Sequence, residues 1–557
     1  MNAAPSVTRR SLLRRPLFGL LLACGLAACG DGSGPAQDNP ERAGARQAAI
    51  GDATLRLGNG PEPDSLDPQR ARTVSALNVI RDLFEGLTAV GPQGTPVPAA
   101  AESWTVSADG LEYRFHLREG LRWSNGDPVV AADYVAGMRR LVDPKTASQY
   151  AQILEPVVNA AAIIGGKRPP SDLGVEAPDV HTIVVRLVNP APYLLGLVSH
   201  TSTFPVHGPS LAEHGERFAQ PGRLVGNGAF VLEDWVVGSH IGVRRNRSYW
   251  DDGNTRLERV RFMHAEDASA EFRQYRAGQI DVSNVVPPQQ YAWIREHLPA
   301  ELHVAPQLST YYYGYNLTRP PFKDQPALRR ALSMVIDRQR LTTAVTGVGE
   351  APAYGFVPRG IADYAPQQFD YATKPYAERV REARELYRQS GYSAANPLEV
   401  EIRYNTGEVH NRLAVAIAAM WKEALGVETT LYAEEFRALL QTIQARADTQ
   451  VFRSSWIGDF NDAYSFLQLL QSDFGINLTG YSNPHYDTLL AEAIRQPDPA
   501  RRRALLEEAE RLMLADHPLL PIYFYVNKHL VKPHVRGWSD NVMNIQYSRH
   551  LWLAPAQ

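Results

Sequence analysis

The chain has 557 residues, of which 44% are hydrophobic and 21% are charged, and its mean hydropathy is −0.29. This is the composition of a globular protein with a large core, and it argues against a membrane-spanning or a disordered chain. The 57 Lys and Arg residues against 60 Asp and Glu residues give a net charge of −3. Because the basic excess that nucleic-acid binding needs is missing, no nucleic-acid partner is expected.

Both cysteines, Cys24 and Cys29, lie near the N-terminus, which excludes a disulfide-stapled body. Four arginines precede an apolar run at residues 17–28, which is too short to span a bilayer and is typical of a signal peptide. The tetrapeptide LAAC at residues 26–29 resembles the bacterial lipobox, so Cys29 is the expected lipidation site. An ordinary signal peptide that happens to contain a cysteine is the alternative, and Cys24 is a poorer second candidate for lipidation.

We therefore expect a signal peptide at residues 1–28 and a flexible lipoprotein tether at residues 29–50. Cleavage before Cys29 removes four arginines and no acids, which moves the net charge from −3 to −7. The expected location is the periplasm, with a lipid anchor to a membrane through Cys29. An arginine pair at residues 9–10 faintly resembles a twin-arginine signal, so the export route stays open.

The body mixes strand and helix patterns in chain order. Residues 111–117 and 181–187 alternate with the period of a strand, and both are rich in β-branched or aromatic residues. Residues 328–336 and 413–424 place apolar side chains at helical spacing, which is typical of core stripes. No stretch of eighteen apolar residues follows residue 29. These patterns predict an α/β body with more than one lobe.

Known catalytic patterns are missing from the chain. The sequence has no zinc-protease, phosphate-loop, nucleophile-elbow or dinucleotide-binding motif, and its 15 histidines have no metal-ligand spacing. Asp459 and Asp462 could form a hydrolytic pair, but residues at this spacing in a turn-rich segment are more often caps and turns. The sequence therefore predicts no enzyme, no catalytic residue, no metal site and no cofactor.

Aromatic residues gather near polar anchors at residues 311–313, at residues 523–525 and at Trp456. Because side chains alternate along a strand, at least one face of each run is expected to be core. The other face is available for a ligand site in which aromatic walls surround a few fixed charges. Such a site suits a ligand that has a constant polar backbone and variable side chains.

Several ordered blocks together resemble the periplasmic oligopeptide-binding proteins, the family-five solute receptors of ABC importers. The resemblance runs from about residue 55 to the C-terminus. The matching blocks are RDLFEGL (81–87), AESW (101–104), FHLR (115–118), WSNGDPV (123–129), GNGAF (226–230), GQID (278–281), PPFKD (320–324), ALS (331–333) and IDR (336–338).

The resemblance implies an α/β fold of the two-lobed periplasmic-binding-protein type, the large cluster-C Venus flytrap with an extra inserted domain. A ligand would be enclosed between the lobes. The expected parts of the body are lobe I at residues 51–85, 210–308 and 525–557, the inserted domain at 86–209, and lobe II at 309–524.

The resemblance also implies the ligand-binding residues. Asp459, within WIGDFN at residues 456–461, matches the aspartate that pairs with the peptide ammonium group, and the backbone of Ser455 and Ile457 would pair with the ligand main chain. Arg453 matches an arginine that meets the carboxylate of shorter peptides, and His410 matches a histidine used by longer ones. The residues expected to line side-chain pockets, to close over the ligand or to anchor it in lobe I are Val74, Tyr150, Tyr312, Trp456 and Tyr525.

Three departures from the better-known enteric receptors concern charge. Arg72 stands ahead of Val74 where those receptors have an acid, Gly314 replaces another acidic residue, and the arginine-histidine pair expected before Arg453 is blurred at residues 442–445. The loss of two acids and the gain of Arg72 predict a weaker preference for lysine-rich peptides.

The leading hypothesis is a monomeric lipoprotein that binds short peptides and delivers them to the transmembrane subunits of an ABC permease with its cytoplasmic ATPase. Within the family, receptors for murein tripeptide, dipeptide, nickel chelate or haem are the alternatives. Outside this transport role, a periplasmic chaperone or a signalling receptor on the same fold is the other hypothesis.

Overall fold

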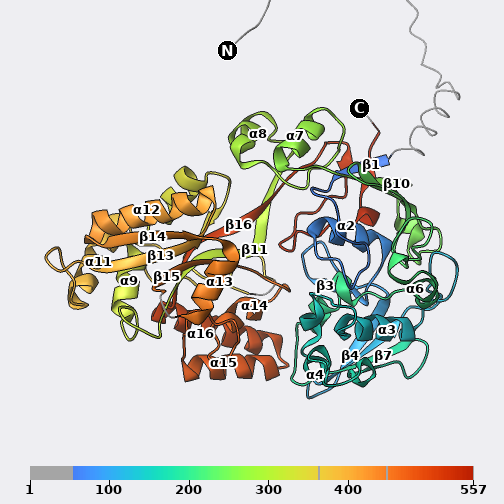
Figure 1. The fold of residues 1–557 in the computed structure, drawn as a ribbon, viewed down its shortest axis with the longest axis horizontal. Coiled ribbons are helices and arrows are strands. Elements are labelled where there is room, and N and C mark those ends of the chain that lie inside the picture. The colour runs from blue at the N-terminus through green and yellow to red at the C-terminus, as the bar shows by residue number, and fades with distance from the viewer. Residues whose placement is uncertain (1–53, 362–363, 447–448, 556–557) are drawn as a thin grey trace, which may run out of the picture. The chain divides into compact units, whose positions relative to one another are not determined.

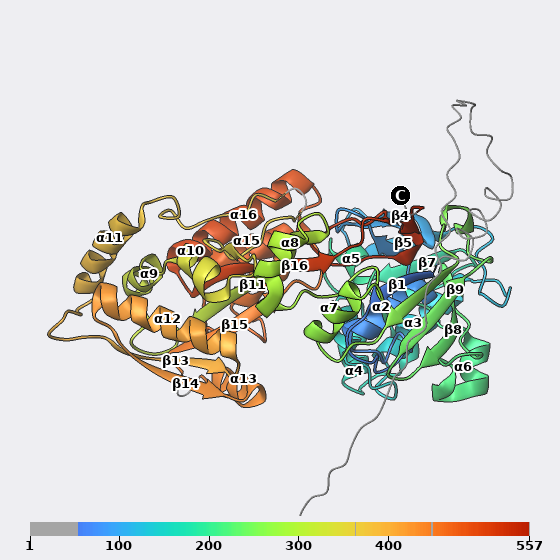
Figure 2. The same ribbon diagram turned by 90° about the horizontal axis from the view of Figure 1, so that it is seen from above.

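The computed structural model describes residues 54–361, 364–446 and 449–555 (Figures 1 and 2). The expected signal peptide, tether and lipidated Cys29 lie outside these residues. Within the described ranges, no helix is long and apolar enough to cross a membrane. The body is a mixed α/β structure that has one main sheet in each of its three main parts, and two further sheets of two strands each, β2-β3 and β17-β18.

The lobe I sheet has the strand order β1-β10-β9-β8. β1 runs parallel to β10, and the other two pairs are antiparallel. Its strands are β1 (Thr54–Gly58), β8 (Phe230–Val236), β9 (His240–Arg245) and β10 (Arg259–Met263). Helix α2 (Val74–Leu83) contacts β8 and begins after Thr73, whose hydroxyl accepts a hydrogen bond from the Ala76 N–H.

The inserted domain contains an antiparallel sheet in the order β4-β5-β7-β6. Its strands are β4 (Ala101–Val106), β5 (Glu112–Leu117), β6 (Val175–Glu176) and β7 (Thr182–Arg186). β5 and β7 confirm the two predicted strands. β5 also shows the predicted alternation, because Tyr113, Phe115 and Leu117 are buried while Arg114 and His116 are exposed, whereas the first four residues of β7 are all buried. Helix α3 (Ala131–Val142) packs against this sheet.

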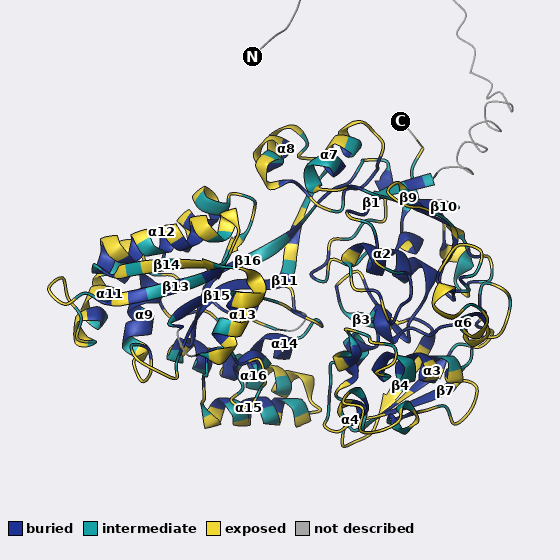
Figure 3. Cartoon of the chain, in the orientation of Figure 1, coloured by how far each residue is buried: buried dark blue, intermediate teal, exposed yellow. Residues whose placement is uncertain are grey.

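The lobe II sheet has six strands in the order β12-β16-β11-β15-β13-β14. β13, β14 and β15 are parallel where they pair, whereas β11 pairs antiparallel with both β15 and β16. The strands are β11 (Leu302–Tyr315), β12 (Ala351–Pro352), β13 (Glu399–Asn405), β14 (Glu428–Glu434), β15 (Val451–Ile457) and β16 (Leu519–Leu530). β11 and β16 are mostly buried, whereas the edge strand β14 has only exposed and half-buried residues (Figure 3).

The two predicted helical stripes of lobe II are confirmed. The first forms α9 (Pro326–Met334), which ends two residues before the predicted limit, and the second lies within α12 (Glu408–Leu425). The buried Trp421 of α12 donates its indole N–H to the Leu332 carbonyl oxygen of α9 at 3.0 Å. The other long helices of lobe II are α11 (Tyr376–Gln389), α13 (Phe436–Ala445), α15 (Pro484–Arg495) and α16 (Pro499–Asp516).

Shorter elements complete the described chain. The remaining strands are β2 (Thr88–Val90), β3 (Pro96–Pro98), β17 (Val535–Arg536) and β18 (Trp552–Leu553). The remaining α-helices are α4 (Ala160–Ile164), α5 (Leu194–Leu197), α6 (Gly208–His214), α7 (Ala268–Arg276), α8 (Tyr291–His297), α10 (Arg338–Arg340) and α14 (Tyr464–Leu467).

Buried side chains form two large cores. One core belongs mainly to lobe II, and the other combines lobe I with the inserted domain. The strand pair β11–β16 runs from Leu302 opposite Leu530 to Gly314 opposite Leu519, with a register shift between Pro306 and Thr310. The pair therefore continues through the expected boundaries at residues 308 and 525, and the exact domain limits stay a prediction.

Candidate functional site

The carboxyl ends of parallel strands in lobe II form the edge where the predicted ligand residues collect. β13 ends at Asn405 and β15 ends at Ile457, and α12 begins at Glu408, just after β13. In open α/β sheets, ligands bind outside this edge, where helix N-termini also offer partial positive charge. Local topology thus places His410 in the first turn of α12 next to the end of β15.

Arg453 is a buried cation on β15 without an acidic partner among the described residues. Its guanidinium donates to Asn405 Oδ1 at 3.0 Å, and to the hydroxyls of Ser455 and Tyr525 at 3.3 Å each. It lies over the Tyr311 ring, 4.6 Å from the centroid, and its Nε–H is buried without an acceptor. A buried charge held only by neutral groups is costly, so this site favours an anionic ligand group.

His410 extends this site as a neutral group. Its Nδ1 lies 3.1 Å from the Tyr311 hydroxyl. Burial lowers the pKa of His410 to about 4, and the positive charge of Arg453 acts in the same direction. At neutral pH the imidazole therefore offers a hydrogen bond to a ligand, but no positive charge.

Asp459 supplies the opposite charge immediately after β15. Its side chain is exposed, yet the protein around it removes enough water to raise the pKa of the carboxyl group. Among the described residues, no hydrogen bond or ion pair engages this carboxylate. Ser465 holds the segment in place, since its hydroxyl accepts hydrogen bonds from the Asp459 backbone N–H at 3.2 Å and from Trp456 Nε1 at 3.4 Å.

One edge of β15 is open next to these charges. From Ser309 opposite Ile457 to Tyr313 opposite Arg453, β15 pairs with β11 on one side. On its other side, β15 pairs with β13 only through Val451 and Phe452. Along Arg453–Ile457, the described chain places no strand against this second edge. An extended ligand can therefore add to the sheet there, as peptides do in β-augmentation.

The strand register separates the predicted residues into two groups. Ser455 and Ile457 share the Arg453 face of β15, and Ile457 is 62% exposed. Tyr312 lies on the opposite face, where it is buried and its ring meets Phe356 edge-on at 5.3 Å. The structure thus brings Arg453, His410, Ser455 and Tyr525 together, whereas it places Tyr312 in the lobe II core beside the half-buried Trp456.

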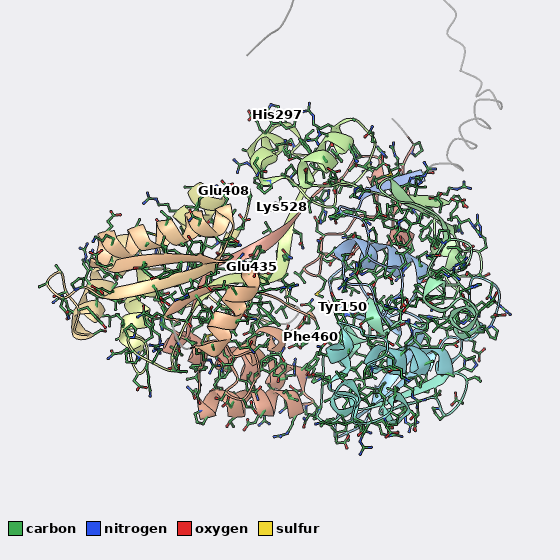
Figure 4. The ribbon with its side chains drawn as sticks, viewed as in Figure 1. Tyr150, His297, Glu408, Glu435, Phe460 and Lys528 are labelled. Atoms are coloured by element: carbon green, nitrogen blue, oxygen red, sulfur yellow. The ribbon has the colours of Figure 1, made fainter. Side chains whose placement is uncertain are left out.

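Tyr150 of the inserted domain lies close to the amine-binding candidate. Figure 4 labels Tyr150 and also Phe460, the residue after Asp459. The Tyr193 ring of the inserted domain stacks on the Phe460 ring, with 4.2 Å between the ring centroids. Burial raises the pKa of the Tyr150 phenol, and the negative charge of Asp459 adds to this rise. The Tyr150 ring also packs on His200, with 4.6 Å between the ring centroids. Two parts of the body therefore meet near Asp459.

Val74 is 63% exposed at the first position of α2. No described contact joins Val74 to Arg453 or Asp459. Two residues before it, the positive charge of Arg72 is neutralised by Asp64, whose Oδ2 lies 3.1 Å from Arg72 Nε. The added arginine is thus engaged in an ion pair within lobe I.

The missing acid at Gly314 has a steric cause. A Cβ atom at this position would lie 2.3 Å from the Phe452 ring, so no side chain fits without displacing that ring. The ring of Phe452 therefore fills the space that an acidic side chain at residue 314 would need.

Residues 442–445 lie in the last part of α13, where the Thr442 hydroxyl donates to Glu434 Oε2 at 2.9 Å.

Three residues near the charges were not singled out from the sequence. Tyr311 supports both Arg453 and His410, Asn405 accepts from Arg453, and Ser465 positions Asp459. Alternation predicts that Tyr311 and Tyr313 share one face of their strand and that Tyr312 lies on the other, but it does not predict which of the two faces is buried in the core. Asn405 and Ser465 carry no signal, because only the fold brings them to the site. Among the described residues, no group of histidines, cysteines and acids is placed to hold a metal ion.

This arrangement defines a class of protein. Two lobes, a mixed sheet with an open strand edge, and opposite unpaired charges near that edge are the features of a solute receptor. The family model of the bacterial extracellular solute-binding proteins, family 5, matches residues 95–478, and the chain belongs to this family.

Known relatives cover almost the whole chain. The probable deoxycholate-binding periplasmic protein YgiS of Escherichia coli is 39% identical over 90% of this chain and 93% of its own length. The periplasmic oligopeptide-binding protein OppA of Escherichia coli is 36% identical over 98% of this chain and 99% of its own length. The unliganded open form of the periplasmic murein tripeptide-binding protein MppA matches with a TM-score of 0.84 at 37% identity, covering 90% of this chain and 97% of that chain.

Proposed function

We propose that this chain captures short oligopeptides through their charged ends and delivers them to an ABC-type permease. The observation that carries this proposal is a pair of opposite charges, Arg453 and Asp459, that have no partners of opposite charge among the described residues. A free peptide carries one ammonium group, which can pair with Asp459, and one carboxylate group, which can pair with Arg453.

The spacing of the two charges fits the length of short peptides. Asp459 lies six positions after Arg453, so their Cα atoms lie at most about 20 Å apart, given roughly 3.3 Å per extended residue. Both side chains shorten the span that the ligand has to cover. Peptides of about two to five residues, which extend over roughly 7–17 Å, suit this span. His410 provides a second, neutral partner for the carboxylate of a ligand of different length.

The backbone between the charges supports recognition that does not depend on sequence. In our proposal, the open edge of β15 at Ser455 and Ile457 binds the peptide main chain, which all peptides share. Tyr150 and Tyr525 flank the two ends, next to Asp459 and Arg453 respectively. Trp456, Tyr312 and Val74 remain proposed contributors to side-chain pockets or to closure.

The cellular role follows from the N-terminal sequence and the family. We propose that the chain is exported, lipidated at Cys29, and works as a monomer in the periplasm beside its permease. The relatives named periplasmic support this location. A periplasmic chaperone or signalling receptor remains the other hypothesis.

Murein tripeptide is the second candidate ligand, because the murein tripeptide-binding protein is 37% identical over 90% of this chain. It carries an α-amino group once it is freed from its sugar, so it can use Asp459 in the same way. Deoxycholate, which is named for the relative YgiS, has a carboxylate but no ammonium group. It would leave Asp459 unpaired, so we rank it below peptides for this site.

Ligand identification tests the proposal directly. Native mass spectrometry of the mature protein, purified from the periplasm, should reveal bound peptides. After unfolding and refolding to remove them, calorimetry should show binding of tri-alanine, and much weaker binding of the N-acetylated or the C-amidated form. If the N-acetylated and C-amidated forms bound as tightly as tri-alanine, recognition through charged ends would be excluded.

A further inference from the structure

A separate cavity of about 570 Å³ lies between the inserted domain and lobe II. The inserted domain contributes residues 106–110, Tyr113 and residues 190–195, and lobe II contributes residues 461–463 with the adjoining ends of α15 and α16. Its volume is within the range of small-molecule sites, which often lie between domains. Arg453, His410 and Asp459 do not line it, so it is distinct from the proposed peptide site.

One side of this cavity is apolar. Tyr113 is buried, and its hydroxyl donates to the Ala191 carbonyl oxygen at 3.2 Å, which leaves the ring for apolar contact. Leu195 and Pro190 continue this wall on the inserted domain, and Leu506 faces it from α16. Hydrocarbon placed here would be removed from water on both sides.

Lobe II also supplies this cavity with arginine donors that lack acceptors among the described residues. Arg502 forms a two-pronged ion pair with Asp462, with N–O distances of 2.7 and 3.0 Å, which neutralises that acid. Arg502 Nε is buried, and the described residues offer it no acceptor. Arg495, the last residue of α15, is exposed, and its guanidinium group has no ion pair or hydrogen bond within the described chain.

The acid on the facing turn is already engaged. The Asp109 carboxylate accepts hydrogen bonds from the Ser107 hydroxyl at 2.5 Å and from the Leu111 N–H at 3.1 Å. Its charge is therefore satisfied within its own turn. The unmet requirement of the cavity is an acceptor for the Arg502 Nε–H and a counter-ion for Arg495.

We propose that this cavity binds an amphipathic organic anion, with its hydrocarbon part against Tyr113, Leu195 and Leu506 and its carboxylate at Arg495 and the Nε–H of Arg502. Apolar side chains and arginine side chains line the same cavity, which matches a molecule that is apolar at one end and anionic at the other. The site is independent of the proposed peptide site.

Decanoate is the probe, tested by calorimetry on the ligand-free mature protein. We expect saturable binding of one decanoate. Arg495→Glu should weaken this binding about tenfold or more, the loss expected for one hydrogen bond to a charged group. Ala108→Trp, at an exposed position of the cavity wall, should abolish binding by filling the space. Arg501→Glu is the matched control, because Arg501 is exposed on the same helix as Arg502 but does not line the cavity.

Two further measurements separate this site from the peptide site. The Asp459→Asn substitution should leave decanoate binding unchanged, and decylamine should bind at least about tenfold more weakly than decanoate. The proposal is overturned if decanoate fails to bind, if Asp459→Asn weakens its binding as much as Arg495→Glu does, if Arg495→Glu has no greater effect than Arg501→Glu, or if decylamine binds equally well.

Discussion

The strongest test of the amine anchor is the Asp459→Asn substitution. Asparagine keeps the size and one acceptor of aspartate but removes the charge, and the Asp459 side chain makes no described contact that the fold depends on. The backbone hydrogen bond to Ser465 should persist. The substitution should therefore change ligand binding without changing stability.

The expected magnitude follows from the environment of the carboxylate. A net hydrogen bond to a charged group contributes about 1.5–3 kcal/mol, and each 1.4 kcal/mol corresponds to a tenfold change in Kd. Because the Asp459 side chain is exposed, water screens part of its attraction to an ammonium group, so the whole of this range is expected and not only its upper end. Asp459→Asn should thus weaken tri-alanine binding by about 10- to 150-fold.

Isothermal titration in a double-mutant-cycle design isolates the interaction. Wild type and Asp459→Asn are each titrated with tri-alanine and with its N-acetylated form, and the exposed Asp473→Asn serves as the control for removing a charge from lobe II. We expect a coupling energy of about 1.5 kcal/mol or more for Asp459 and none for Asp473. If Asp459→Asn weakened binding of the acetylated and the free peptide equally, the substitution would act through structure, and the anchor assignment would be refuted.

Three further predictions concern other parts of the body. Arg453→Gln should weaken tri-alanine about tenfold or more but leave the binding of C-amidated tri-alanine unchanged, because only the first ligand has a carboxylate; calorimetry with both ligands checks this, and equal losses would contradict it. Glu271 is buried, and burial raises its pKa from 4.5 to about 7, so the stability it contributes below pH 4.5 is lost as the pH rises through about 7. In urea unfolding, the unfolding free energy of Glu271→Gln relative to wild type should rise by about 3 kcal/mol between pH 4.5 and pH 8. A difference that does not change with pH would argue against this titration. Gly314→Ala should cost about 1–3 kcal/mol of unfolding free energy, because its Cβ would meet the Phe452 ring at 2.3 Å, and the additional substitution Phe452→Leu should recover part of this loss.

Local patterns predicted the elements whose periodicity is set by one buried face. Alternation at residues 111–117 became β5, and the helical stripe at residues 413–424 became part of α12, because burial of one face enforces each period. The same alternation along residues 311–313 left the buried face undecided. Both faces of this central strand are aromatic, and only its pairing with β15 and β16 shows that Tyr311 lies with Arg453.

Sites built from distant segments were less predictable. The match to family motifs drew attention to Asp459 and Arg453, but the residues that hold them, such as Ser465 and Asn405, are known only from the fold. No sequence pattern predicted the cavity between the inserted domain and lobe II, because its lining residues Tyr113 and Arg502 are almost 400 positions apart in the sequence. Such contacts depend on how the lobes pack, which no local pattern records.

The long β11–β16 pair has a mechanical consequence for the receptor. Its ladder shifts register between Pro306 and Thr310, and Pro306 has no N–H to donate there. A second register shift lies between Tyr311 and Tyr312. Bending should therefore concentrate between Pro306 and Tyr312, while the regularly paired residues 302–306 move together with their β16 partners. Since no cysteine follows Cys29, two engineered thiols placed on either side of Pro306 would carry fluorophores at unique positions. The change in transfer efficiency between the dyes would then measure the bending of this ribbon during ligand capture.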